Sequence, residues 1–251
     1  MPVDLLFAWL MVMLRATALA TVLPTLGAKP LPVMLKVGFA MCMATLLYGI
    51  VPHASLAGVG WGRLAIAAGG EVLIGLAMGF IGRLIFAAIE MAGRIIVTEI
   101  GLVAGPGFDV PAPDTEPLPS YLSMFAGVLF FVFGGHLSVL RAFARSFDFA
   151  AAGTPGLAAD SVETIVRMTS NSVELGVRIA APFLALNFLV TLAFSILGRA
   201  VPRMNIFVLS FPVRVILGLM MFAGSGALFA RYLFGEFDAL PWRMLQLLPV
   251  H

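Results

Sequence analysis

Residues 179–198 read IAAPFLALNFLVTLAFSILG, and no position in this stretch carries a charged side chain. A helix rises 1.5 Å per residue, so about 20 apolar residues are enough to cross the hydrocarbon core of a bilayer. A second uncharged run, residues 117–136, reads PLPSYLSMFAGVLFFVFGGH. These two stretches predict membrane-embedded helices and therefore an integral membrane protein.

The composition of the whole chain agrees with this interpretation. Hydrophobic residues make up 61% of the chain and charged residues 11%, and the mean hydropathy is +1.06. A soluble domain usually has about 25% charged residues, which cover its surface. Lipid or partner proteins must therefore cover this chain.

Two classes of site are disfavoured by the same numbers. The net charge of +2 is small and the basic residues are scattered, which argues against nucleic-acid binding. The one cysteine, Cys42, excludes an intrachain disulfide and a cysteine-based metal site. We interpret Cys42 as a small buried apolar side chain.

Six apolar segments predict an all-α fold of about six long helices within a single membrane-embedded domain spanning residues 1–251. Loops rich in glycine, proline or small residues separate the segments, and Ser161 is expected to cap the fifth helix. The segments run approximately over Leu5–Leu26, Pro32–Val51, Leu64–Val103, Leu118–Phe143, Val173–Leu197 and Ile206–Phe234.

Charged residues lie inside or at the edge of several segments: Arg15, Lys36, Glu71, Arg83 and Arg214. A charge on a lipid-facing helix at mid-bilayer costs roughly 2.5–3.5 kcal/mol. The basic residues of the loops also do not gather on one side of the membrane, as they do in a simple bundle. We therefore expect these helices to face protein or a water-filled path.

Glu71 begins the motif EVLIGLAMGF, which ends at Phe80. An intramembrane carboxylate can bind a proton, or it can be a structural group paired with an arginine or placed at a helix end. Gly75 and Gly79 have the small-xxx-small spacing that allows another backbone to approach closely.

The segment 104–119 contains five prolines and two glycines and is predicted not to be helical. It joins two long apolar helices and combines the apolar Phe108 and Val110 with acidic residues. Such a loop can fold back into a pore and block it, or it can be a plain exposed connector.

Motifs for catalysis and for nucleotide binding are absent from the sequence. There is no HExxH, no P-loop, no GxGxxG after a strand and no GxSxG. His136 is distant in sequence from the other histidines and is interpreted as a polar residue near a helix end. We therefore expect neither an enzyme nor a bound metal or cofactor.

Several motifs together resemble the FliR family, the flagellar biosynthetic proteins of the type III export gate, whose virulence counterpart is the SctT family. The resemblance covers about residues 5–245. It rests on Glu71–Phe80, on Gly101-Leu102 followed by Phe108-Asp109, on Gly135-His136-Leu137, and most specifically on residues 202–212, which read PRMNIFVLSFP.

The resemblance implies a channel subunit of the flagellar export gate in the bacterial inner membrane, within the basal body. FliR-like proteins assemble with FliP-like and FliQ-like subunits into a helical, pseudo-symmetric conduit for unfolded export substrates, and an FlhB-like protein wraps its cytoplasmic side. Helices in such an assembly do not all cross the membrane in the ordinary way, which would account for the charges inside apolar segments.

The resemblance also implies roles for particular residues. A loop near 101–117 would plug the channel, with Gly101, Gly105, Gly107, Phe108, Asp109 and Val110 in it. This chain has Val110 between Asp109 and Pro111, where the family pattern reads F-D-P. Motif residues expected to serve helix packing or subunit contact are Glu71, Gly75, Gly79, His136, Asn205, Phe207 and Pro212.

One alternative of another class remains open at this point, a secondary transporter or proton-conducting membrane protein that uses Glu71. A transporter of that kind would be expected to show inverted repeats and broken helices in both halves.

Overall fold

The computed structural model describes residues 3–23, 32–54, 59–102, 117–201 and 205–249. In these residues the chain forms eight helices, no strand, and one isolated parallel bridge between His53 and Ala152. The predicted all-α class is therefore confirmed. The helices are α1 (Val3–Val22), α2 (Val33–Leu47), α3 (Trp61–Ile100), α4 (Pro117–Val132), α5 (Gly135–Phe149), α6 (Ser161–Ala200), α7 (Ile206–Gly224) and α8 (Gly226–Leu245).

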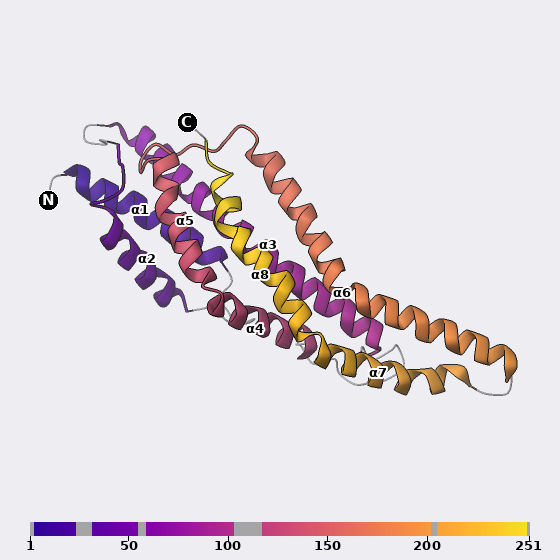
Figure 1. Ribbon diagram of the computed structural model, residues 1–251. Coiled ribbons are helices and arrows are strands. Elements are labelled where there is room, and N and C mark those ends of the chain that lie inside the picture. Colours follow the sequence, from indigo (N-terminus) through magenta and orange to yellow (C-terminus); the bar gives the residue numbers. More distant parts are fainter. Residues whose placement is uncertain (1–2, 24–31, 55–58, 103–116, 202–204, 250–251) are drawn as a thin grey trace.

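The helices form a wide body that narrows into an arm (Figure 1). The body contains α1, α2, α5, α8 and the first half of α6, packed along α3. The arm consists of residues 183–201 of α6 together with α7, and it projects past the end of α3. Pro182 lies within α6, and the helix bends near its middle, as expected where proline removes a backbone hydrogen bond.

Two of the six predicted segments are divided into two helices each. The axes of α4 and α5 differ by 66°, and the break falls at Gly134, whose φ is +71°. Glycine adopts this left-handed conformation without the steric penalty of other residues. The axes of α7 and α8 differ by 52° at Ser225, whose hydroxyl donates a hydrogen bond to the Met221 carbonyl.

Three local predictions are corrected by the structure. Pro117 and Pro119 lie in the first turn of α4, where a missing backbone N–H removes no intrahelical bond. Asp160, not Ser161, occupies the N-cap of α6. Cys42 is exposed on α2, because that short helix packs mainly through its small residues Ala40 and Ala44.

By length and composition, three of the described helices can cross a membrane: α1, α3 and α6. The count rises to five if each bent pair forms one span. Helices α3 and α6 each have 40 residues. At 1.5 Å per residue they are about 60 Å long, roughly twice the thickness of the hydrocarbon core. Each therefore extends beyond the core or crosses it obliquely.

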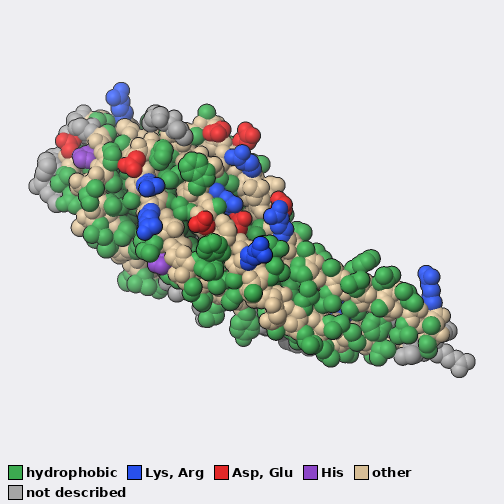
Figure 2. All heavy atoms as spheres, viewed as in Figure 1, with side chains coloured by type: hydrophobic (Ala, Val, Ile, Leu, Met, Phe, Trp, Pro, Cys, Tyr) green, Lys and Arg blue, Asp and Glu red, His purple; other side chains and the backbone are tan. Residues whose placement is uncertain are grey.

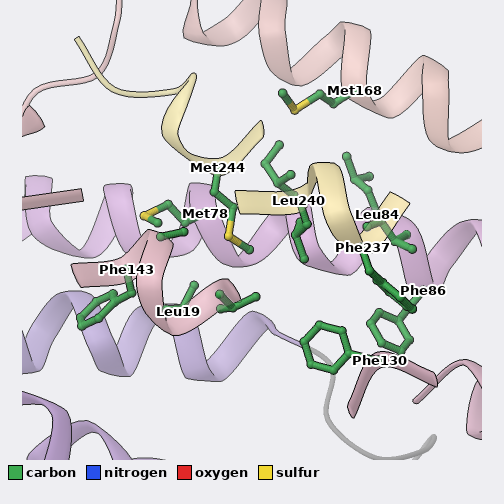
Figure 3. Packing of buried hydrophobic residues seen from close by; sticks show 14 of the residues in the cluster. Leu19, Met78, Leu84, Phe86, Phe130, Phe143, Met168, Phe237, Leu240 and Met244 are labelled. Atoms are coloured by element: carbon green, nitrogen blue, oxygen red, sulfur yellow. The ribbon is translucent and has the colours of Figure 1, made fainter. Parts of the chain in front are cut away.

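The core is filled mainly by side chains from α1, α3, α4, α5, α6 and α8, with Ala40 and Ala44 from α2 (Figure 3). Phe86 of α3, Phe130 of α4 and Phe237 of α8 meet there, with ring centroids 5.3–6.0 Å apart. Hydrophobic burial contributes little between helices in lipid, so close van der Waals packing of this kind holds them together.

Candidate functional site

The Glu71 side chain of α3 is paired with Arg15 of α1 in the middle of the body. Arg15 Nε lies 2.6 Å from Glu71 Oε2, and neither side chain is exposed. Of the possibilities that the sequence left open for Glu71, the structure places it in a buried ion pair with an arginine.

Every remaining polar group of this pair has a partner as well. Arg15 Nη1 donates to Ser146 Oγ and Nη2 donates to the Ala150 carbonyl, each at 2.9 Å. Gly153 N donates to Glu71 Oε1, also at 2.9 Å. The guanidinium carbon of Arg15 also lies 4.0 Å from the centroid of the Phe147 ring. A buried network that is satisfied in this way fixes one arrangement of its helices.

The network also attaches the loop between α5 and α6 to the body. Gly153 in this loop is bonded to Glu71, and Pro155 lies against Gly70, the preceding residue of α3. A Cβ atom on Gly70 would stand 2.3 Å from Pro155 Cγ. Glu71 therefore joins α1, α3 and the 150–160 loop in one contact.

Gly75 and Gly79 form the close approach of α3 to α1. A Cβ on Gly75 would stand 2.4 Å from the Arg15 carbonyl oxygen, and one on Gly79 would stand 3.0 Å from the Leu19 carbonyl oxygen. The two backbones can meet at this distance only because both positions are glycine. The motif that begins at Glu71 thus forms one continuous contact with α1.

Of the six residues named for the predicted plug, only Gly101 is among the described residues. Gly101 ends α3 in the left-handed conformation, with φ of +84°, and packs against the Phe211 ring of α7. Gly105, Gly107, Phe108, Asp109 and Val110 lie outside the described residues, so their roles stay predictions.

His136 lies in the first turn of α5, at the bend between α4 and α5. Its ring stacks on Phe131, with centroids 5.0 Å apart. It also borders an apolar cavity of about 290 Å³ between α1, α2, α4 and α5, where Lys36 is the charged residue of the lining. Within the described part of the chain, no group of three or more His, Cys, Asp or Glu residues is placed to hold a metal ion.

The motif at residues 202–212 opens α7. Asn205 is the N-cap, and its Oδ1 accepts a hydrogen bond from Val208 N. Pro212 lies inside α7 on an exposed face. Phe207 belongs to the first turn of α7.

Sequence reasoning missed several partners in these contacts. It did not identify Ser146, Ala150 or Gly153 as partners of the buried pair, because they lie 75 or more positions from Glu71 and carry no motif. It also missed Asn187, which donates a hydrogen bond to Glu99 of α3 at 2.5 Å. Asn187 is the amide side chain in the uncharged stretch 179–198, and a polar group in such a stretch indicates a polar partner on another helix.

One face of α3 shows a change of character along its length. From Ile66 to Phe80 its large exposed side chains are apolar, whereas Arg63 in the first turn is exposed. In the second half they include Arg83, Glu90, Arg94 and Thr98, spaced so that all four lie on the same face. We call these four residues the α3 polar stripe. Glu90 and Arg94, four positions apart in this stripe, are not among the ion pairs within 4.0 Å that the described residues form.

Beyond the α3 polar stripe, the surface becomes apolar again along the arm. Figure 2 shows most of the charged side chains over the body, whereas the arm carries mainly hydrophobic side chains and one basic side chain near its tip on the face in view. Among the side chains of the arm that the structure describes, seven large apolar ones are more than half exposed: Phe188, Leu189, Ile196, Val208, Phe211, Ile216 and Met220.

Comparison with known proteins agrees with these features. Residues 6–240 match the family described as bacterial export proteins, family 1. The flagellar biosynthetic protein FliR of Escherichia coli K12 is 28% identical over 95% of this chain and 92% of its own length. FliR of Pectobacterium carotovorum is 30% identical over 93% of this chain and 91% of its own length.

A relative from a virulence-associated system is similar over most of its length too. The Yop proteins translocation protein T of Yersinia pestis is 27% identical over 83% of this chain and 82% of its own length. The chain therefore belongs to the bacterial export proteins, family 1, the family of the FliR proteins, and is a helical membrane component of a bacterial protein export apparatus.

Proposed function

We propose that this protein is a structural channel subunit of the flagellar type III export gate. It assembles with FliP-like and FliQ-like subunits in the bacterial inner membrane, at the basal body, and an FlhB-like protein contacts the gate. Unfolded substrates pass through the conduit that these subunits enclose. The chain contributes to it as a single membrane-embedded unit.

The α3 polar stripe is the observation that carries this proposal. Arg83, Glu90 and Arg94 are exposed in the isolated chain. The large exposed side chains between Ile66 and Phe80 on α3, and those of the arm apart from Arg199, are apolar. Intramembrane charges face a protein interior or a water-filled cavity because lipid solvates them poorly. A position along a water-filled conduit between sibling subunits meets this requirement.

The exposed arm supports the same assembly. In the most apolar 18-residue stretch of α6, only 22% of the residues are buried within this chain. An extended exposed apolar surface marks a region that contacts a partner protein or a membrane. In the proposed assembly, helices of neighbouring subunits pack against the exposed side chains of the arm, which nothing within this chain covers.

We also propose that the segment following Gly101 plugs the closed channel. Two contacts hold the ends of this segment in place. Gly101 packs on Phe211, and Gly93 of α3 packs on Pro119 at the start of α4, where a Cβ on Gly93 would stand 2.8 Å from Pro119 Cα. The start of the segment is therefore held against α7 and its end against α3. Anchors at both ends suit a segment that must stay at the closed channel.

The geometry of Glu71 supports a structural role over proton transport. Both of its oxygens accept hydrogen bonds from buried donors, Arg15 Nε and Gly153 N. A carboxylate that carries protons needs an accessible state, and in this structure Glu71 is fully buried.

The proposal is tested by purifying the tagged full-length chain from its own cells in a mild detergent. We expect FliP-like and FliQ-like chains to elute with it in one complex, which mass spectrometry of the intact assembly would identify. A stable monomer that elutes alone under the same conditions would contradict the proposal.

A further inference from the structure

A small polar cluster lies where α3, α6 and α7 meet, at the base of the apolar arm. It consists of Glu99 on α3, Asn187 and Thr191 on α6, and Arg214 on α7. Asn187 Nδ2 donates to Glu99 Oε2 at 2.5 Å, and Arg214 Nη2 donates to Thr191 Oγ1 at 3.1 Å. We call these four residues the arm-base cluster.

Two buried polar atoms of the arm-base cluster lack a protein partner. Arg214 Nε and Asn187 Oδ1 are both inaccessible and form no hydrogen bond with any described residue. One is a donor and the other an acceptor. Buried polar atoms in folded proteins nearly always have a partner, and a bound water supplies it where no protein group does.

A small cavity lined by these two residues has room for a single water molecule. A cavity of about 10 Å³ is lined by the side chains of Glu99, Asn187 and Arg214. This volume is close to the minimum of about 10–15 Å³ that one water requires when measured with a water-sized sphere. The rest of the lining is apolar: Ile100, Phe183, Leu186, Val190 and Gly218.

The charged groups of Glu99 and Arg214, which both line this cavity, also lack a direct contact with each other. Glu99 and Arg214 carry opposite charges, but no ion pair within 4.0 Å joins them among the described residues. Charged groups within membrane segments pair with each other or with other polar groups. A bridging water is nearly as favourable in enthalpy as a direct hydrogen bond.

We infer that one water molecule binds in this cavity and joins the three helices. It accepts a hydrogen bond from Arg214 Nε and donates to Asn187 Oδ1 and to the Glu99 carboxylate. Three hydrogen bonds are the usual number for a buried water. Glu99, Asn187 and Arg214 are then positioning residues that set how the arm lies on the end of α3.

The location gives this contact its importance for the chain. Glu99 stands two residues before Gly101, where α3 ends and the chain continues into residues 103–116. Next to it, Ile100 packs on Gly218 of α7: a Cβ on Gly218 would stand 2.5 Å from Ile100 Cγ1. The arm-base cluster is the polar part of a contact between α3, α6 and α7 that is otherwise apolar. The inferred water does not depend on the proposed export-gate function.

A density map of the full-length protein in its native complex, at a resolution that shows ordered water, tests the inference directly. We expect a peak within hydrogen-bonding distance of both Arg214 Nε and Asn187 Oδ1. A direct ion pair between Arg214 and Glu99, with no peak between them, would overturn the inference.

Cross-linking tests the role of the cluster in solution. Cysteines at Ile100 and Gly218, in a Cys42→Ala background, would report the contact of α3 with α7 through their rate of disulfide formation. We expect both Arg214→Met and Arg214→Lys to slow this rate about fivefold, the factor for one net hydrogen bond of typical strength. Lysine keeps the charge but has no N–H at the Nε position.

The Arg214→Lys variant distinguishes an effect of the positive charge from an effect of the hydrogen bond that Arg214 Nε donates. If Arg214→Lys cross-links as fast as the parent, the charge alone is sufficient and the water-bridged contact is wrong. Arg178→Lys is the matched control, because Arg178 lies on the same helix as Asn187 in an exposed pair with Glu174. We expect that control to leave the rate unchanged.

Discussion

Glu71 Oε2 lies 2.6 Å from Arg15 Nε, and both side chains are completely buried although they come from two helices of a membrane protein. The pair joins α1 to α3 at the point where Gly75 and Gly79 bring their backbones together. It also holds the loop between α5 and α6 through Gly153. One ion pair therefore positions three parts of the chain.

The first prediction concerns this pair. Glu71→Gln should lower the free energy of unfolding by about 3–5 kcal/mol, because it leaves the Arg15 guanidinium buried without its counter-charge. Unfolding in detergent, followed by loss of helical circular dichroism, would measure the change. Glu174→Gln is the matched control, since Glu174 pairs with Arg178 at an exposed site and should cost less than about 1 kcal/mol.

A double substitution sharpens the same test. Arg15→Met combined with Glu71→Leu removes both charges, so its cost should be smaller than the sum of the two single costs. Additive costs would show that the two side chains do not act as a pair.

The second prediction concerns the close approach at Gly75. Gly75→Ala should destabilise the chain by about 1–3 kcal/mol, because the new methyl group would overlap the Arg15 carbonyl oxygen and Ala18 Cβ. Gly69→Ala on the same helix meets nothing within 4 Å and should be neutral or stabilising. The same unfolding assay compares the two, and equal effects would contradict the packing described for α1 and α3.

The third prediction concerns the bend between α4 and α5. A Cβ on Gly134 meets no atom within 4 Å, so Gly134→Ala tests backbone conformation alone. We expect a cost of about 1–2 kcal/mol from the left-handed φ of +71°. Gly134→Asn should cost less, because asparagine tolerates that conformation better. If alanine costs nothing, the bend does not need the left-handed residue.

The fourth prediction concerns the proposed plug. Deleting residues 104–116 from the chain in its assembled gate should make cells leaky to small ions, which conductance or dye-uptake measurements would detect. A deletion of residues 55–58, which lie between α2 and α3 in the sequence, serves as the control. Unchanged permeability in a gate that still assembles would remove the plug assignment.

The sequence predicted the helical class and the approximate position of every apolar segment, because long uncharged runs have few structural solutions in a membrane. It did not predict the breaks at Gly134 and Ser225. No charged residue lies within five positions of either break, so the hydrophobic pattern does not show where the helix ends.

The partner of Glu71 was likewise beyond the sequence. The spacing of Gly75 and Gly79 predicted a close helix contact, but several arginines were available to the carboxylate. Arg15 is 56 positions away, and only the packing of α1 along α3 selects it. The Gly153 contact depends on a loop without a motif, so single-sequence reasoning had no means of finding it.

The burial of the arm against other subunits is the central claim, and Phe188 tests it most directly because its side chain is 67% exposed in this chain. A photo-activated cross-linking residue in place of Phe188 should form an adduct with a FliP-like or FliQ-like subunit in cells. The adduct should disappear in a strain that lacks the FliP-like gene. Adducts with lipid alone, in cells that contain all the subunits, would contradict the account.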